Sequence, residues 1–180
     1  MKKVLLLLLI LLMLGGCGQE KSFEEDYPMF ADQEHVYSYS TYDEVVSAFT
    51  VTEGVSVVLF GFKTCPYCQL TMPIINQAAL ACGIEKIHYL DIKEMRDQET
   101  AEYLLLLGYL DSKVDDLDVR DGKKRLTVPD LYVIKDGEIL SHRIATFKTA
   151  SGYLLDLTEQ EKDDLFNIYK QMFNEALTAN

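Results

Sequence analysis

Residues 55–68 read VSVVLFGFKTCPYC, and this stretch decides the fold. Its first part is almost continuously apolar and rich in β-branched and aromatic side chains, as in a strand that is buried on both faces. A helix is predicted from about Pro66 to Ala81, because proline is tolerated at the first helical position and apolar residues then recur at helical spacing, at Leu70, Ile74, Ile75 and Ala78. Two cysteines therefore lie where a buried strand passes into a helix.

Cys65 and Cys68 have the spacing of a pair that opens and closes a disulfide. A helix that begins at Cys65 points unpaired backbone N–H groups at its sulfur, which lowers the thiol pKa and favours the reactive thiolate. The alternative is half of a zinc site, which needs two further ligands, usually a second close pair. The other cysteines and histidines stand singly, so we predict redox chemistry and no metal; they are Cys17, Cys82, His35, His88 and His142.

The sequence around this pair predicts an α/β domain with the element order β-α-β-α-β-α-β-β-α. Thr41 and Thr158 each begin a capping box, which marks a helix start, and Asp136-Gly137 predicts a hairpin. Residues 111–125 are expected to form a loop of mixed charge. Periodicity places strands at 36–40, 55–62, 84–92, 131–134 and 138–143, and helices at 41–49, 66–81, 94–110 and 158–176.

The first residues have the pattern of an export signal. Met1-Lys2-Lys3 precedes an apolar run from Val4 to Leu14, which is shorter than the roughly 20 residues of a membrane-spanning helix. Leu14-Gly15-Gly16-Cys17 resembles the lipobox of bacterial lipoproteins, in which the cysteine is acylated, for example with palmitate; a cleaved signal with a coincidental cysteine is the alternative. The expected organisation is a lipoprotein signal peptide over 1–16, an acidic tether over 17–35 and one domain over 36–180.

The charge of the chain limits its partners. A formal net charge of −12 at pH 7 disfavours binding to nucleic acid or to anionic lipid headgroups through bulk charge. Lys123-Lys124-Arg125 is a local basic cluster, interpreted either as a patch for an acidic substrate or as ordinary solvated loop charge. The apolar run from Tyr103 to Leu110 is either a docking surface or, as we favour, part of the core.

The element order, with C-x-x-C at the second strand-to-helix junction, resembles the thioredoxin fold, with a central mixed sheet flanked by helices, over about residues 36–178. Three local matches support the resemblance. Cys65-Pro66-Tyr67-Cys68 is the glutaredoxin tetrapeptide, Pro73 matches the helix-kinking proline of thioredoxins, and Thr127-Val128-Pro129 matches their cis-proline loop. Exported thioredoxin-like lipoproteins of Gram-positive bacteria, some described as bacteriocin-transport accessory proteins, are similar as well.

The resemblance implies a role for each matching residue. Cys65 would be the exposed nucleophile and Cys68 the resolving thiol, and the proline of the cis-proline loop would be in the cis form. Lys63 is a candidate for lowering the Cys65 pKa, with a lysine that only solvates the loop as the alternative. Substrate would be bound by Pro66, Tyr67, Thr127, Val128 and Pro129.

Cys82 lies too far from the pair to join it. A helix that contains both residues separates Cys82 from Cys68 by about 21 Å, whereas a disulfide needs Cα atoms within about 7 Å. Cys82 is therefore expected to be a buried, inert thiol, with an intermolecular or regulatory role as the alternative.

Two departures from the families narrow the expected activity. Glutaredoxins follow the cis-proline with a Gly-Gly turn for glutathione, and this chain lacks that turn after Pro129. Leu59 occupies the position of a buried acid in thioredoxins, so no proton acceptor for Cys68 is identified.

The sequence thus predicts a membrane-anchored, extracytoplasmic thiol–disulfide oxidoreductase for protein disulfides or dithiols, whose Cys65–Cys68 disulfide is redox-active and which needs no other cofactor. Its partners would be exported protein substrates and a membrane thiol carrier or a reoxidising protein, with no nucleic acid. The reductase direction is slightly favoured, because no cation lies between the cysteines to stabilise the reduced form. The alternative is an accessory or chaperone-like module that binds an exported peptide and does not need its C-x-x-C.

Overall fold

The computed structural model describes residues 22–179, so the expected signal peptide and Cys17 lie outside the described residues. The centre of the domain is a five-stranded sheet in the order β1-β3-β2-β6-β7. β1, β3 and β2 are parallel, whereas β6 is antiparallel to β2 and β7 is antiparallel to β6. The strands are β1 (Tyr37–Tyr39), β2 (Val55–Gly61), β3 (Ile87–Asp91), β6 (Asp130–Lys135) and β7 (Glu138–Ile144).

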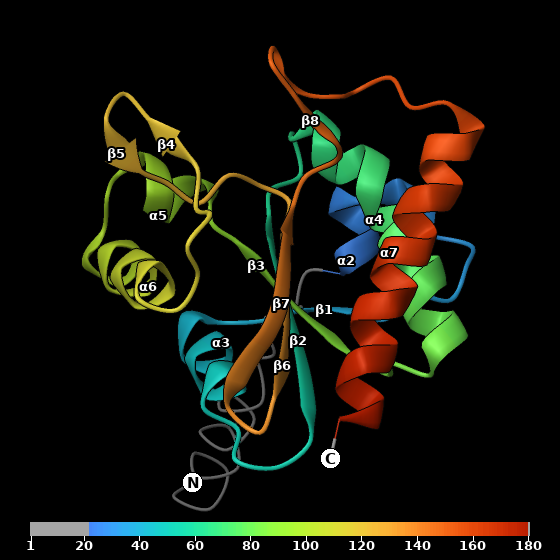
Figure 1. The fold of residues 1–180 in the computed structure, drawn as a ribbon, viewed down its shortest axis with the longest axis horizontal. Coiled ribbons are helices and arrows are strands. Elements are labelled where there is room, and N and C mark those ends of the chain that lie inside the picture. The colour runs from blue at the N-terminus through green and yellow to red at the C-terminus, as the bar shows by residue number, and fades with distance from the viewer. Residues whose placement is uncertain (1–21, 180) are drawn as a thin grey trace, which may run out of the picture.

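Helices cover both faces of this sheet (Figure 1). On one side α4 (Pro66–Cys82) packs against the C-terminal helix α7 (Glu159–Thr178). On the other side lie α3 (Tyr42–Phe49), α5 (Lys93–Asp97) and α6 (Ala101–Asp111). The layers, the mixed sheet and the order of the main elements confirm the thioredoxin fold that the sequence predicts.

Local sequence signals determine where several elements begin and end. Thr41 and Thr158 each cap a helix with their side chains, and both capping boxes are complete, since Glu44 and Glu161 bond back to the cap backbone. Asp136 and Gly137 have positive φ angles of 50° and 82°, as the tight hairpin between β6 and β7 requires.

The single helix predicted over 94–110 is wrong, because the structure has two helices there. Glu99, between α5 and α6, adopts a positive φ of 48°, which a continuous helix does not allow. The Thr100 side chain then accepts a hydrogen bond from the backbone N–H of Tyr103 and begins α6 as its N-cap.

The expected loop over 111–125 contains a short hairpin, formed by β4 (Val119–Arg120) and β5 (Lys123–Lys124). Asp121 and Gly122, with φ angles of 52° and 77°, make its turn. A second short hairpin, β8 (Lys148–Thr149) with β9 (Gly152–Tyr153), follows β7. Both hairpins lie at the end of the sheet where α4 begins (Figure 1).

The acidic tether expected over 17–35 is contradicted in its described part. Residues 23–26 form the short helix α2 (Phe23–Asp26), and a 3-10 turn, η2 (Pro28–Phe30), follows it. Phe23, Tyr27 and Phe30 are at most 5% exposed and belong to the hydrophobic core. These aromatic side chains bury too much apolar area for the segment to stay solvated, and the folded unit therefore begins before residue 36.

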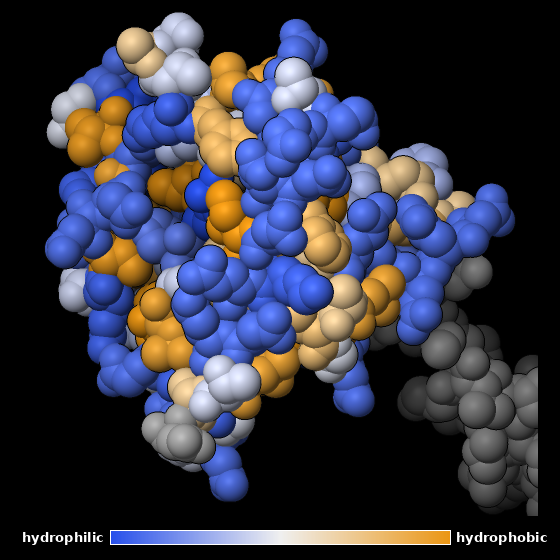
Figure 2. All heavy atoms as spheres, turned by 45° about the vertical axis from the view of Figure 1, so that its right-hand side comes forward, coloured by the Kyte–Doolittle hydropathy of each residue, from blue (hydrophilic) through white to orange (hydrophobic). Residues whose placement is uncertain are grey.

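Within the described residues, no helix is long and apolar enough to cross a membrane. Figure 2 views the molecule with the α4 and α7 side brought forward, and this face is mostly hydrophilic with separate apolar patches.

Candidate redox site

Cys65 is the N-cap residue of α4, and its sulfur faces the interior. Its Sγ accepts a hydrogen bond from the backbone N–H of Cys68 at 3.4 Å and lies 3.5 Å from the carbonyl oxygen of Val128. The residue is only 3% exposed, so the exposed nucleophile implied by the resemblance is wrong for this conformation. The sulfur is turned toward the helix N–H groups and the cis-proline loop.

The two thiols have opposite pKa shifts. The hydrogen bond from the Cys68 thiol, with backbone N–H groups of Cys68 and Tyr67, lowers the pKa of Cys65 to about 7 despite its burial. Burial raises the pKa of Cys68 well above its usual value, and its bond to Cys65 adds to that shift. The outer sulfur is therefore ionised first and the inner sulfur keeps its proton, as a nucleophile and a resolving thiol require.

The cation that contributes to the low pKa of Cys65 is Arg96, which the sequence analysis missed. The Arg96 guanidinium packs over the Phe62 ring at 4.9 Å, and the Phe62 carbonyl accepts the backbone N–H of Cys65. Lys63, the candidate from sequence, lies 3.2 Å from Asp26 of α2. Arg96 lies on α5, far along the chain from Cys65, so no spacing in the sequence connects the two residues.

The cis-proline loop lies beside the thiols. The Val128–Pro129 peptide bond is cis, as the resemblance implied, and both residues are buried. Tyr67 is half-buried, and its hydroxyl donates to the carbonyl of Tyr153 in β9 at 3.1 Å. Pro66 is exposed and Thr127 half-buried. The predicted substrate-binding residues are thus gathered around Cys65, and their roles stay predictions.

Buried tyrosines lie around Cys68. Burial raises the pKa values of these tyrosines, and their proximity to Cys68 adds to each shift; they are Tyr27, Tyr37, Tyr89 and Tyr169. The hydroxyls of Tyr27 and Tyr89 share a 2.5 Å hydrogen bond. A Cβ at Gly61 would lie 2.8 Å from the Tyr89 ring and 3.3 Å from the Cys68 sulfur, so this glycine makes room for both.

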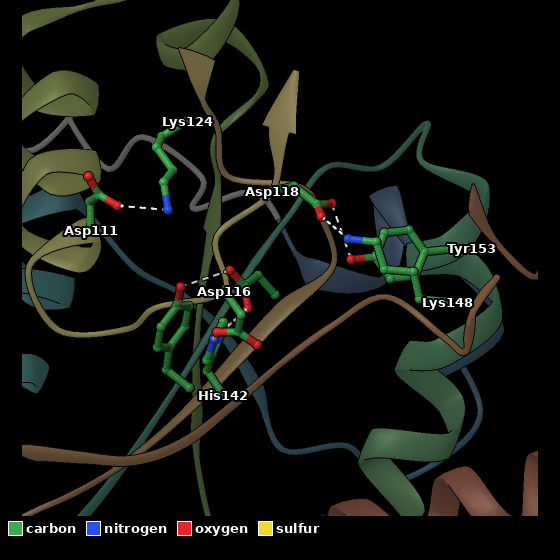
Figure 3. A network of polar contacts seen from close by, with 9 residues as sticks. Asp111, Asp116, Asp118, Lys124, His142, Lys148 and Tyr153 are labelled. Atoms are coloured by element: carbon green, nitrogen blue, oxygen red, sulfur yellow. Dashed lines mark hydrogen bonds and ion pairs between the residues drawn. The ribbon is translucent and has the colours of Figure 1, made fainter. Parts of the chain in front are cut away.

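Two polar networks hold the rim of the site together (Figure 3). Asp118 bonds to Lys148 of β8 and to the Tyr153 hydroxyl, and these bonds with that of Thr127 lower the pKa of Asp118 despite its partial burial. The loop before the cis-proline is thereby fixed to the β8–β9 hairpin, which in turn accepts the Tyr67 hydroxyl.

His142 forms the second network and has partners that its sequence neighbours do not reveal. Its ring bonds to the buried Asp130 at 3.1 Å and to Asp116 on the loop. Burial alone would lower the pKa of His142, but the two carboxylates raise it to about 9. Asp130 also accepts the Tyr132 hydroxyl at 2.8 Å.

Over residues 22–179, the structure places no group of three or more His, Cys, Asp or Glu side chains where they would hold a metal ion. Cys82 is half-buried at the end of α4, so the expectation that it is buried is wrong; its Sγ contacts the carbonyl of Lys170 at 3.6 Å. Its thiol pKa is raised by burial, which makes it less reactive than Cys65.

The order and directions of the five strands, with the cysteine pair at the start of α4, define the thioredoxin fold. No protein-family model and no curated protein sequence matches the chain. Among solved structures, thioredoxin O2 from Arabidopsis thaliana is 15% identical, with 77% of this chain and 96% of that chain covered and a TM-score of 0.48. Thioredoxin from Trypanosoma brucei brucei is 12% identical, with 80% and 91% covered and a TM-score of 0.46. Because both TM-scores are below 0.5, the fold assignment rests on the sheet topology.

Proposed function

We propose that the protein is a thiol–disulfide oxidoreductase that acts on disulfides or dithiols of other proteins. The observation that carries the proposal is the Cys65 thiol at the N-terminus of α4, with its pKa lowered to about 7 beside a buried second thiol. A thiol with a pKa near the ambient pH is partly ionised and still strongly nucleophilic, which is the best compromise for attack on a disulfide.

In the reducing direction, the Cys65 thiolate attacks one sulfur of the substrate disulfide. The substrate S–S bond breaks, one substrate thiolate leaves, and a mixed disulfide joins Cys65 to the substrate. Cys68 then loses its proton to solvent or to the departing thiolate and attacks the Cys65 sulfur. The second substrate thiolate leaves, the Cys65–Cys68 disulfide forms, and two electrons have passed to the substrate.

Insulin disulfide reduction tests this proposal. Cys65→Ser should reduce the rate by about a hundredfold or more, because the thiolate is the nucleophile. Cys68→Ala should trap substrates as mixed disulfides on Cys65, whereas Cys82→Ser should act like the wild type. Full activity of Cys65→Ser would contradict the mechanism. A cellular role that survives replacement of both active-site cysteines would favour the alternative, a peptide-binding module.

We infer a reductase direction from the moderate pKa of Cys65 and the absence of a cationic residue between the cysteines in the sequence. A less stabilised thiolate makes the dithiol a better electron donor. The reduction potential should then lie nearer that of thioredoxin, about −270 mV, than that of a strong oxidant, about −120 mV. Equilibration with glutathione buffers measures it, and a value near the oxidising end would reverse the direction.

The proposed place of action is the outer face of the cell membrane, with a lipid on Cys17. The support is the sequence alone, namely the apolar run from Val4 to Leu14 and the Leu14–Cys17 lipobox. Labelling of cells with a palmitate analogue should mark the wild type and not Cys17→Ala, which should appear in the culture medium or the soluble fraction. Equal labelling of both proteins would rule out Cys17 as the lipidation site.

A further inference from the structure

A basic pocket is lined by residues of α5, α6 and the β4–β5 hairpin. These elements lie on the same side of the molecule in Figure 1. Its volume is about 640 Å³. Five of its ten lining residues are basic and two are acidic, although the chain as a whole has a net charge of −12. The basic residues are Arg96, Arg120, Lys123, Lys124 and Arg125.

Two of these cations have no acidic partner among residues 22–179. Lys124 pairs with Asp111 at 3.2 Å, as Figure 3 shows, and Lys123 lies 3.7 Å from Glu99. Within residues 22–179, no ion pair or side-chain hydrogen bond engages the guanidinium of Arg120 or Arg125. A guanidinium presents a planar fork of donors that matches a carboxylate in two parallel hydrogen bonds, so the pocket offers two such forks to a ligand.

The pocket also has an apolar side. Tyr103, Leu104 and Leu107 of α6 line it, and Leu104 is 51% exposed. A small ligand with only charged groups would leave this apolar surface exposed to solvent. A peptide that carries both acidic and apolar side chains would cover it. Exposed apolar area next to unpaired arginines is therefore better matched by a protein segment than by a small anion.

The pocket is connected to the redox site through Arg96, which packs on Phe62, whose carbonyl accepts the backbone N–H of Cys65. The charge of Arg96 also contributes to the lowered pKa of Cys65. Arg125 stands on the segment that leads to the cis-proline loop, and its backbone N–H bonds to Asp118, which anchors that loop. A segment bound in the pocket would continue toward Cys65.

We propose that this pocket docks an acidic, partly apolar segment of the protein substrate next to the disulfide that Cys65 attacks. The proposal rests on the proposed function and names the substrate class of the same site. It also gives the Lys123-Lys124-Arg125 cluster a role in substrate binding. Arg120 and Arg96 belong to the same pocket, although they are not adjacent to this cluster in the sequence.

Binding of a cysteine-free peptide tests the docking step separately from redox chemistry. The probe is a fluorescent peptide of alternating acidic residues and leucines. Its neutral control has glutamine in place of each acidic residue. Binding of both peptides is measured by fluorescence anisotropy at low and at high salt. The acidic peptide should bind, bind more weakly in salt, and lose at least tenfold in affinity in Arg120→Glu/Arg125→Glu. Lys162→Glu/Lys170→Glu on α7 makes the same charge change elsewhere and should leave binding unchanged, as should Cys65→Ser/Cys68→Ser.

Turnover then shows whether docking serves the reaction. Arg120→Glu/Arg125→Glu should lower kcat/KM at least tenfold for an acidic peptide disulfide and leave it unchanged for a neutral one, which also shows that the variant is folded. Equal binding of the neutral and acidic peptides, or equal losses in the α7 control, would overturn the proposal. Binding to phosphatidylglycerol vesicles without binding to the peptide would overturn it in favour of a lipid surface. If the wild type reduces neither the acidic nor the neutral peptide disulfide but still binds the acidic peptide, the proposed redox function is wrong and the proposed docking role of the pocket is supported.

Discussion

Several groups lower the pKa of Cys65, and single substitutions can test their contributions one at a time. The lowered value, about 7, arises from the Cys68 hydrogen bond, from N–H groups of α4 and from the charge of Arg96. Because only the thiolate reacts, the rate of Cys65 alkylation by iodoacetamide follows the ionised fraction of Cys65; it is measured at that residue by mass spectrometry, with Cys68 kept in place. In the wild type the rate should be half-maximal near pH 7.

Arg96→Gln should move that midpoint to higher pH, because it removes a favourable charge from the thiolate. Lys63→Gln is the matched control, since Lys63 pairs with Asp26. A larger shift in Lys63→Gln than in Arg96→Gln would restore Lys63 as the tuning cation predicted from sequence. An unshifted midpoint in Arg96→Gln would remove the role assigned to Arg96.

Gly61 is a second residue whose importance comes from its surroundings. A methyl group there would meet the Tyr89 ring at 2.8 Å and the Cys68 sulfur at 3.3 Å, so Gly61→Ala should lower the free energy of unfolding by about 1–3 kcal/mol. Gly108 on α6 has open space around it, and Gly108→Ala should instead be neutral or stabilise by up to about 1 kcal/mol. Urea unfolding of both variants measures the difference, and equal stabilities would contradict the close packing behind Cys68.

At the scale of elements, the N-terminal segment over 22–35 is the part of the fold that the sequence predicted least well. Phe30 is 1% exposed in the core, so Phe30→Ala should cost about 3–5 kcal/mol of unfolding free energy. The exposed Asp32 is its control, and Asp32→Ala should change stability by less than about 0.5 kcal/mol. If Phe30→Ala is as stable as Asp32→Ala, the segment is a tether after all.

Tyr27→Phe examines the same segment at its contact with the redox site. The substitution removes the hydroxyl that bonds to Tyr89 and keeps the ring, so it should cost about 0.5–1.5 kcal/mol. It should also leave insulin reduction measurable, because the cysteines and the cis-proline loop are untouched. Calorimetry measures the stability and the insulin assay measures the activity. If Tyr27→Phe causes no loss of stability, the hydrogen bond between the Tyr27 and Tyr89 hydroxyls does not form.

The elements that the sequence predicted share one physical property, which is that their signals are local. Capping boxes at Thr41 and Thr158, and the Asp136-Gly137 turn, are set by neighbours within a few residues, and the structure confirms all three. Asp121-Gly122 has the same turn sequence inside the loop predicted over 111–125, and the structure shows that it is the turn of the β4–β5 hairpin. Burial of Phe23 and Phe30 depends on distant strands, so no local pattern shows it.

The residues of the candidate site also divide into those with local sequence signals and those brought in by distant elements. Cys65 and Cys68 could be found because strand, helix start and proline are adjacent in the chain. Arg96, Tyr89 and Asp118 reach the site from other elements, and only the folded arrangement brings them there. Contacts of this kind leave no periodicity or spacing in one sequence.

At the scale of the whole molecule, two groups make stability depend on pH in opposite directions. The pKa of His142 is raised to about 9, so its contribution is fully present below its ordinary pKa of 6.5 and is lost as the pH rises through 9. The pKa of Cys65 is lowered to about 7 from 9, so its contribution is present above pH 9 and is lost as the pH falls through 7. Between pH 7 and 9 the two therefore cancel in part.

Cys65→Ser removes the contribution of Cys65, so that the contribution of His142 to the pH dependence of stability can be measured without it. In that background the free energy of unfolding should fall steadily between pH 6.5 and 9, with a slope of at most one proton, because the unfolded chain releases the His142 proton more easily than the folded one. Adding His142→Gln should remove the slope, because the group whose pKa is raised to about 9 is then absent. Urea titrations at half-unit pH steps measure this slope, and a slope that persists in Cys65→Ser/His142→Gln would contradict its assignment to His142 and assign it to another titrating group.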